Sequence, residues 1–391
     1  MKLATRVMEL NESATLAVTA KAARMMADGI DVVSFAAGEP DFDTPPHIIR
    51  AAVEALDAGH TRYPKPASGI PVAKIAVCAK LARENDLNYK PEQVIITNGG
   101  KMAIYLAIHA LVDPGDEVII PVPYWVSYPE MVGLAGGVPI FVAGPEAKDY
   151  KLTPDTLRAV LTERTKLFLL TSPSNPSGVT YTPDEIRGLA GVLRDRDVWV
   201  MSDEIYDRLL FDGHETLSYA SVGQKAYRQT LTVNSVSKTY AMTGWRIGYA
   251  AGPVELIDAM ARIQSQSTSG APTFAQYALA TALTADQAPV EHMRVEFERR
   301  AHRMYDRLRA MPGFRCPKPT GAFYCFPNVS GAFDRLGVRG SVAVAEKLLE
   351  AARVAVVPGL AFGLDEHIRL SFATSMALID KGLDRIETLL R

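Results

Sequence analysis

From about residue 90 onward, short apolar runs alternate with longer segments of helical periodicity. "GKMAIYLAIHALV" (100–112) and "TPDEIRGLAGVLRD" (182–195) repeat apolar positions at the spacing of an amphipathic helix. Near-continuous apolar runs are typical of strands that are covered on both faces. The chain is therefore predicted to be α/β, with a mostly parallel sheet between helices. The predicted strands are "QVIIT" (93–97), "EVIIP" (117–121), "KLFLLT" (166–171), "VWVMSD" (198–203) and "QTLTVNS" (229–235).

The pattern changes beyond about residue 285. A long charged helix is predicted over 291–311, and short strands follow within 322–329, 354–359 and 368–373. This mixture predicts a smaller α+β domain, beside which the first 45 residues, with a helix at 14–28, are expected to pack. The predicted division is a large domain over 46–284 and a small domain formed by 1–45 and 285–391.

Composition narrows the function classes. The chain has 391 residues, 48% of them hydrophobic, and a formal net charge of −2, which provides no field that would attract nucleic acid. It contains no apolar run of about 18 residues and no apolar core of a signal peptide at its start. The three scattered cysteines favour a reducing compartment. We therefore expect a soluble cytoplasmic protein that binds neither nucleic acid nor membrane. Without a CxxC pair or an HExxH motif, no metal site is expected.

Chemically distinctive residues follow each predicted strand. In an open α/β sheet, ligands bind outside the carboxyl ends of the strands, so five such strand ends together predict one site. The segments are "TNGGK" (97–101), "PVPYW" (121–125), "SPSNPSG" (172–178), "SDEIY" (202–206) and "SVSK" (235–238).

In "TNGGK", Gly99 and Gly100 allow close approach of the backbone, and the amides of the following helix favour a phosphate. The segment is not a Walker A loop, because Met102 stands where that loop needs a hydroxyl. The alternative is an ordinary turn between strand and helix.

Five further side chains each have two interpretations. A carboxylate at the end of a buried strand, such as Asp203, needs a partner, either a protonated heterocyclic nitrogen or an internal cap or cation. Asn175 is a ligand donor or a turn residue before proline. Trp125 and Tyr124 stack on a planar ring or fill the core. Arg369 binds a carboxylate through its planar fork, or lies on an edge strand facing water.

Lys238 has hydroxyl neighbours rather than acidic ones, in "SVSKTYAMTGWRIGY" (235–249). A desolvated lysine near other cations has a lowered pKa and forms a Schiff base with a carbonyl compound. Serine hydroxyls and a guanidinium bind phosphate. The combination indicates pyridoxal phosphate, whose aldehyde, ring nitrogen and phosphate match three sets of residues. These are Lys238 for the aldehyde, Asp203 for the ring nitrogen, and Gly100, Ser235, Ser237 and Arg246 for the phosphate.

Over almost its whole length the chain resembles the class I aminotransferases of fold type I. It is similar to the bacterial subgroup of aspartate aminotransferases that includes some prephenate aminotransferases. The resemblance implies a large domain with a mostly parallel seven-stranded sheet, a smaller α+β domain, and a homodimer with shared active sites. Besides the segments above, it is carried by "AAGEPDFDTP" (36–45), "RYPKPASGIP" (62–71), "PYWVSYPEM" (123–131) and "HIRLSFATS" (367–375).

The resemblance also implies a role for each site residue. Lys238 is expected to form the Schiff base and move the proton, while Asp203 keeps the ring nitrogen protonated. Tyr206 and Asn175 contact the ring hydroxyl, and Trp125 stacks on the ring. The phosphate is expected to be held by the amides of Gly100 and Lys101, by Ser235, Ser237 and Arg246, and by Tyr63 of the partner subunit. The substrate α-carboxylate is expected at Arg369, assisted by Asn175, Trp125 and the Gly38 backbone.

The substrate side chain is expected near Lys101, which matches the lysine that contacts the distal carboxylate of dicarboxylic substrates in this subgroup. Thr15 matches a threonine linked in the family to prephenate use. Relatives commonly have "KPSAT" where this chain has "NESAT", so Asn11 and Glu12 remove a cation and add an anion. This departure leaves the use of prephenate open.

Three functions follow from these observations. The first is ping-pong transamination between L-aspartate or glutamate and 2-oxoglutarate or oxaloacetate. The second keeps the cofactor but is a β-lyase, or an aminotransferase for aromatic or neutral amino acids, and Lys101 argues against it. An aminotransferase for prephenate or arogenate is a further alternative on the same scaffold. The third is a regulator that keeps the fold without the activity, and it lacks the basic charge that a DNA-binding module needs.

Overall fold

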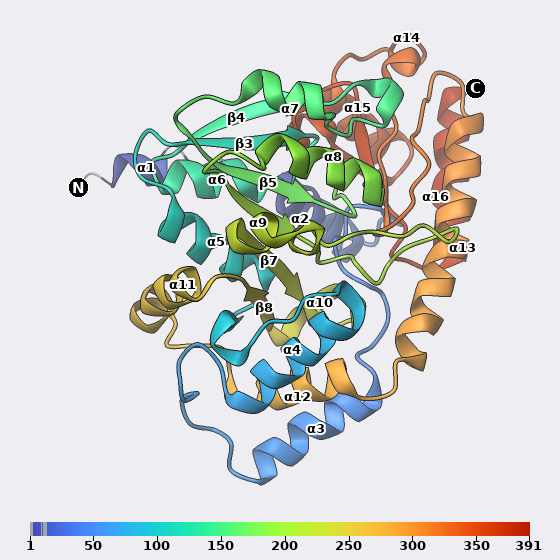
Figure 1. Ribbon diagram of the computed structural model, residues 1–391. Helices are drawn as coiled ribbons and strands as arrows, with labels where there is room; N and C mark the ends of the chain where they lie inside the picture. The colour runs from blue at the N-terminus through green and yellow to red at the C-terminus, as the bar shows by residue number, and fades with distance from the viewer. Residues whose placement is uncertain (1–2, 9, 11–13) are drawn as a thin grey trace.

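A computed structural model describes residues 3–8, 10 and 14–391 of the chain (Figure 1). At its centre lies a seven-stranded sheet in which β8 (Gly248–Ala251) runs antiparallel to both of its neighbours. The other six strands run parallel to one another, which confirms the predicted sheet. The strand order is β2 (Val94–Thr97), β8, β7 (Thr230–Ser235), β6 (Trp199–Asp203), β5 (Thr165–Thr171), β3 (Glu117–Val122) and β4 (Val138–Ala143).

Five of these strands coincide with the predicted ones, whereas β4 and β8 were not predicted. β4 lies at the edge of the sheet, where Val138 is 40% and Phe141 48% exposed. Its sequence, "VPIFVA", therefore lacks the continuous buried run of a central strand. β8 is "GYAA", which has no β-branched residue and owes its place to its two neighbours.

Both faces of the sheet are buried, as the apolar strands predict. Along β3, Val118 and Ile120 pack with α5 (Gly100–Leu111), α6 (Ser127–Leu134) and α11 (Val254–Ser267). Ile119, between them, packs on the opposite face with α7 (Pro154–Val160) and α8 (Pro183–Leu193). Each such side chain contributes about 1.5–3 kcal/mol when fully buried. This two-sided core fixes the positions of the strand ends.

A second group of helices covers the part of the sheet near β2. α3 (Pro46–Asp57), α4 (Pro71–Asn85) and α12 (Thr273–Thr284) share a core with Val94 and Ile96 of β2. In Figure 1 these three helices lie together at the bottom of the view.

The C-terminal region contains the predicted long helix, α13 (Ala288–Ala310), beside α16 (Met376–Leu390) (Figure 1). Arg303 of α13 forms a 2.6 Å salt bridge with Asp380 of α16. The short predicted strands are present as β9 (Tyr324–Cys325), β10 (Val354–Ala355), β11 (Val357–Pro358) and β12 (Ile368–Ser371). β11, β12 and β9 form an antiparallel sheet.

The N-terminal segment joins this region, since β1 (Val33–Ser34) pairs in parallel with β10. The predicted helix at 14–28 is present as α2 (Ala14–Ala27). The remaining α-helices are α1 (Thr5–Met8), α9 (Gln224–Gln229), α10 (Val236–Thr239), α14 (Phe333–Leu336) and α15 (Ser341–Ala351). Among the described residues, no helix combines the length and the apolar character that crossing a membrane requires.

Candidate active site

A cavity of about 270 Å³ lies at the carboxyl ends of the parallel strands, where the sequence predicts a site. Asp203 is the last residue of β6, and Lys238 lies in α10, directly after β7. α5 begins at Gly100, after β2, and Arg369 enters from β12. The predicted site residues that line the cavity are Thr15, Gly38, Gly100, Lys101, Trp125, Asn175, Asp203, Tyr206, Ser237, Lys238, Arg246 and Arg369.

The amine of Lys238 is largely buried, and among the described residues no acidic side chain contacts it directly. Its Nζ donates to the carbonyl oxygen of Gly38 at 2.5 Å. Burial lowers the pKa of Lys238 to about 8, an effect that the charge of Glu39 opposes and the guanidinium groups of Arg369 and Arg246 reinforce. An amine with this pKa is partly unprotonated near neutral pH and is therefore able to attack a carbonyl carbon.

Asp203 is buried, and burial raises its pKa to about 6. The phenol of Tyr128 donates to Oδ2 at 2.7 Å, and the amide of Ile205 donates to Oδ1 at 3.3 Å. Within the described part of the chain, no lysine or arginine forms a salt bridge with this carboxylate. The arrangement suits a partner that arrives with a ligand and carries a proton.

Arg369 is 2% exposed, so the alternative of an edge-strand arginine facing water is wrong. Its Nη1 donates to Oδ1 of Asn175 at 3.0 Å and its Nη2 to the carbonyl oxygen of Ala36 at 2.9 Å. In the described residues its Nε has no hydrogen-bond partner. A buried cation held only by neutral acceptors attracts an anion, and its planar fork suits a carboxylate.

Asn175 and Tyr206 present donors to the same cavity. Because Oδ1 of Asn175 accepts from Arg369, its Nδ2 is left as a donor toward a ligand. The hydroxyl of Tyr206 lies 3.0 Å from that of Tyr324, whose ring lies 4.6 Å from the Arg369 guanidinium.

The first turn of α5 has the form of an anion site. Gly99 has φ +86°, and a Cβ there would lie 2.6 Å from Nη2 of Arg246. The glycine thus lets the guanidinium approach the unpaired amides at the helix start. Arg246 is oriented by a 2.7 Å hydrogen bond from its Nη1 to the Thr243 carbonyl oxygen. Amides and guanidinium together fit a phosphate.

Of the two predicted serines, only Ser237 lines the cavity. Ser235 lies behind it: its hydroxyl donates to the Ile247 carbonyl oxygen at 2.9 Å and accepts from the Ser237 amide at 3.1 Å. In this conformation Ser235 supports Ser237.

The comparisons with known proteins agree with this geometry. A family model described as "Aminotransferase class I and II" matches residues 30–386. The chain belongs to this family. It is 48% identical over 386 residues to the aspartate aminotransferase of Geobacillus stearothermophilus, which covers 99% of this chain and 98% of that protein. It is 49% identical to the aspartate/prephenate aminotransferase of Cereibacter sphaeroides, over 96% and 95% of the two chains.

Solved structures of aminotransferases have the same fold. The aspartate aminotransferase of Rhizobium meliloti matches with a TM-score of 0.95 and 41% identity, over 100% of this chain and 99% of that one. The Thermus thermophilus aspartate aminotransferase with maleate matches with a TM-score of 0.94 and 44% identity, over the full length of both. The predicted family and fold type are thereby confirmed.

In this aminotransferase, Lys101 and Trp125 lie together on one wall of the cavity. Nζ of Lys101 lies 4.9 Å from the centre of the Trp125 ring. Burial, followed by the charge of Arg246, lowers the pKa of Lys101. Tyr124, the other predicted candidate for stacking, does not line this cavity; its ring stacks on Phe141 at 5.0 Å.

One predicted site residue, Tyr63, lies away from the rest of the site. Tyr63 is 78% exposed and lines a separate surface hollow with Pro272 and Phe274. Thr15 lines the cavity, whereas Asn11 and Glu12 lie outside the described residues.

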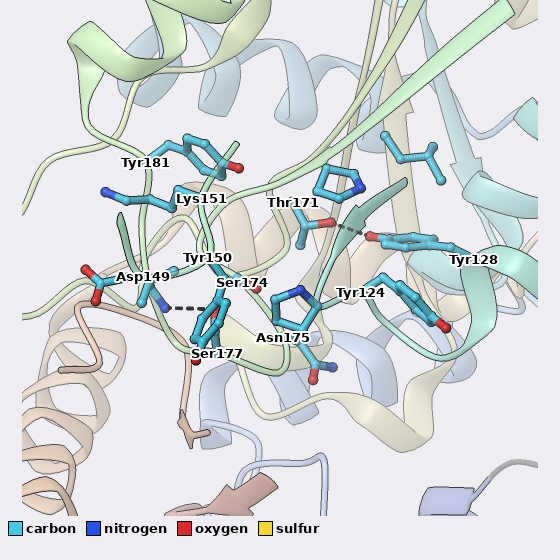
Figure 2. A pocket seen from close by; sticks show the side chains of 14 residues that line it. Tyr124, Tyr128, Asp149, Tyr150, Lys151, Thr171, Ser174, Asn175, Ser177 and Tyr181 are labelled. Carbon is cyan, nitrogen blue, oxygen red and sulfur yellow. Dashed lines mark hydrogen bonds between the residues drawn. The ribbon is translucent and has the colours of Figure 1, made fainter. Parts of the chain in front are cut away.

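The sequence analysis missed five polar residues that line this cavity: Ser127, Tyr128, Thr171, Thr243 and Tyr324. Tyr128 and Thr171, which also line the small second cavity drawn in Figure 2, form a hydrogen bond of 2.7 Å. Thr171 is the last residue of β5 and Tyr128 lies in the segment 123–131 that carries the family resemblance, so their position was a usable signal. Tyr324 comes from β9 in the C-terminal region, and no local pattern connects it to the sheet.

Proposed function

We propose that this protein is a pyridoxal-phosphate-dependent aminotransferase. It moves the amino group of L-aspartate or L-glutamate to 2-oxoglutarate or oxaloacetate in two half-reactions. The observation that carries the proposal is a buried lysine of lowered pKa that shares one cavity with a buried carboxylate and a buried arginine. Membership of the family and the names of its relatives support the same reaction.

The described residues fit the cofactor at both of its ends. The turn at Gly99, which a Cβ would fill, and the Arg246 guanidinium suit a phosphate. Gly100, Lys101 and Ser237 lie around them, and Ser235 supports Ser237 from behind. Asp203, without an internal cation, suits a protonated ring nitrogen. When bound, pyridoxal phosphate supplies an electron sink that stabilises negative charge at the substrate α-carbon.

The chain itself binds, orients and moves a proton. Lys238 has its Nζ beside the Gly38 carbonyl, and its lowered pKa lets it accept a proton in one step and return it in the next. Trp125 would cover the cofactor ring, and Tyr206 and Asn175 would donate to the ring oxygen. These groups fix the direction from which the proton is taken.

The substrate is held by its carboxylates. Arg369 binds the α-carboxylate through its fork, with the Asn175 amide and the Gly38 backbone beside it. Lys101, at the opposite wall with Trp125, attracts the distal carboxylate of aspartate or glutamate. Two cations in one cavity favour dicarboxylic substrates over neutral ones.

We also propose a cytoplasmic homodimer whose subunits share their active sites. Support comes from Tyr63, an exposed aromatic residue that does not line the cavity of its own chain. In the dimer it reaches the phosphate held by the partner subunit. Three free cysteines support the cytoplasmic location. Residues 46–284 form the large domain in this proposal, and 1–45 with 285–391 form the small one.

Prephenate is the second candidate substrate. It is favoured by Thr15, which lines the cavity, and by the Cereibacter sphaeroides relative, whose name includes prephenate.

The test is a set of single half-reactions. The purified protein, loaded with pyridoxal phosphate, is mixed separately with aspartate, glutamate, alanine, phenylalanine and arogenate, and the change of the cofactor absorption is recorded. Aspartate and glutamate are expected to react fastest. If neither reacts, the assignment to acidic substrates is wrong, and a fast reaction with arogenate would favour prephenate as the acceptor. Lys238→Ala is the control: a borohydride-reducible adduct that persists in this variant would contradict the role of Lys238.

A further inference from the structure

The Asp203 carboxylate is held by a chain of two hydroxyl groups, of which Tyr128 is buried and Thr171 is half-buried. The Tyr128 hydroxyl lies 2.7 Å from Oδ2 of Asp203 and 2.7 Å from Oγ1 of Thr171. Figure 2 shows the link between Tyr128 and Thr171 as a dashed line. Tyr128 is 2% exposed, so water does not compete strongly for these bonds.

The direction of the chain follows from the number of protons available. An ionised carboxylate only accepts, and a phenol has one proton to donate. When Tyr128 donates that proton to Asp203, its oxygen accepts from the Thr171 hydroxyl. The order is therefore Thr171 to Tyr128 to Asp203.

The position of Tyr128 is fixed independently of this chain. It lies in the first turn of α6, where its amide donates to the Trp125 carbonyl oxygen at 3.0 Å. The two rings meet edge to face, with centres 5.3 Å apart at 84°. One short segment thus connects Trp125, which faces the cavity, to Asp203 at its base.

We propose that Tyr128 is a positioning residue, which, oriented by Thr171, holds the Asp203 carboxylate ionised and in the direction that the cofactor's ring nitrogen requires. The inference rests on the proposed function for the identity of the cofactor. Its effect on Asp203 itself does not depend on the cofactor.

The variants are Tyr128→Phe, Thr171→Val and the double variant, each of which removes a hydroxyl and keeps most of the shape. The matched control is Tyr181→Phe. Tyr181 is also buried and lines the small cavity drawn in Figure 2, but its hydroxyl accepts from the Leu152 amide at 2.8 Å.

The first measurement is the dissociation constant of pyridoxal phosphate. Tyr128→Phe removes a hydrogen bond to a charged group. It is therefore expected to bind pyridoxal phosphate about 10- to 100-fold more weakly. Thr171→Val alone is expected to weaken the binding of pyridoxal phosphate roughly 3-fold. Added to Tyr128→Phe, it is expected to weaken the binding no further. Tyr181→Phe is expected to stay within about 2-fold of the unaltered protein.

The second measurement uses the cofactor-free protein, whose unfolding midpoint is followed against pH with and without Asp203→Asn in the background. The difference reports the ionisation of Asp203, because the substitution removes that group alone. The Tyr128 hydrogen bond lowers the Asp203 pKa. Tyr128→Phe is therefore expected to move the pH midpoint of the Asp203 ionisation upward by roughly one pH unit.

The outcomes separate the two proposals. If Tyr128→Phe changes neither the affinity for pyridoxal phosphate nor the pH midpoint of the Asp203 ionisation, the inference is overturned. A full Thr171→Val effect in the Tyr128→Phe background overturns the ordered chain. Failure of the unaltered protein to bind pyridoxal phosphate overturns the proposed function, while the midpoint shift in the cofactor-free protein still decides the role of Tyr128.

Discussion

Nη1 of Arg369 donates to Oδ1 of Asn175 at 3.0 Å, although 194 positions separate the two residues in the sequence. Arg369 comes from β12 in the C-terminal region, and Asn175 from the loop after β5 in the central sheet. The bond orients both groups before a ligand arrives, because it points the guanidinium into the cavity and leaves Nδ2 of Asn175 as a donor. The neutral partner also leaves the arginine charge uncompensated.

Replacing Arg369 with lysine is expected to lower kcat/KM for aspartate by roughly 30- to 1000-fold. A lysine keeps the charge but loses the fork that pairs with a carboxylate, which corresponds to about 2–4 kcal/mol for a buried charged pair. Steady-state kinetics with aspartate and with 2-oxoglutarate measure the effect. The value of kcat/KM is expected to fall for both substrates, because both carry the carboxylate that pairs with Arg369. The control is Arg196→Lys at an exposed position. A loss below about 5-fold would contradict the role of Arg369.

The rate at which the cofactor-free protein combines with pyridoxal phosphate is expected to rise with pH around a midpoint near 8. Only the unprotonated amine of Lys238 attacks an aldehyde, and burial lowers its pKa to about 8. Rapid-mixing absorbance between pH 6 and 10, roughly the range that spans this transition, follows the reaction. Arg369→Leu is expected to move the midpoint upward, since that guanidinium helps to lower the pKa. A midpoint near 10.5, the ordinary value for lysine, would refute the prediction.

Sequence reasoning succeeded where the chemistry of the site is local. Lys238, Asp203 and the glycines at the start of α5 each lie at the end of a strand or just after it, so the rule that ligands bind at strand ends placed them together. It failed where position depends on the rest of the fold. β8 has the sequence "GYAA" and is a strand because two neighbours bond to it. Tyr324 contacts Arg369 through the pairing of β9 with β12, which no local pattern encodes.

Asp203→Asn is expected to stabilise the cofactor-free protein at neutral pH while abolishing transamination. Burial raises the Asp203 pKa from 3.8 to about 6, so the folded protein holds this proton more tightly than the unfolded chain does. The unaltered protein therefore loses stability as pH rises from about 4 to about 6, by about 3 kcal/mol in all. The asparagine variant has no group that ionises here, so it does not lose this stability. Its extra stability relative to the unaltered protein is therefore full at pH 7.5 and shrinks toward pH 4, roughly the unfolded pKa.

Chemical denaturation at a series of pH values measures this difference. Asp197→Asn is the control, because the Asp197 side chain is fully exposed and forms only a surface ion pair with Lys225. The same gain for both variants, or a gain that grows as the pH falls, would show that Asp203 is not held with a raised pKa.

Gly99→Ala is expected to weaken the binding of pyridoxal phosphate beyond what its effect on thermal stability accounts for. The new Cβ would lie 2.6 Å from Nη2 of Arg246, so the guanidinium must move from its place beside the first turn of α5. The matched control is Gly115→Ala, since Gly115 has a similar φ, +92° against +86°, but no atom within 4 Å of the new Cβ. Both variants carry the backbone strain of an L-residue at positive φ, about 1–2 kcal/mol. Only Gly99→Ala disturbs the anion site, so the two are expected to share a similar loss of thermal stability and to differ by about 10-fold or more in the dissociation constant of the cofactor. Equal affinity in the two variants would mean that the close approach of Gly99 and Arg246 does not serve the phosphate.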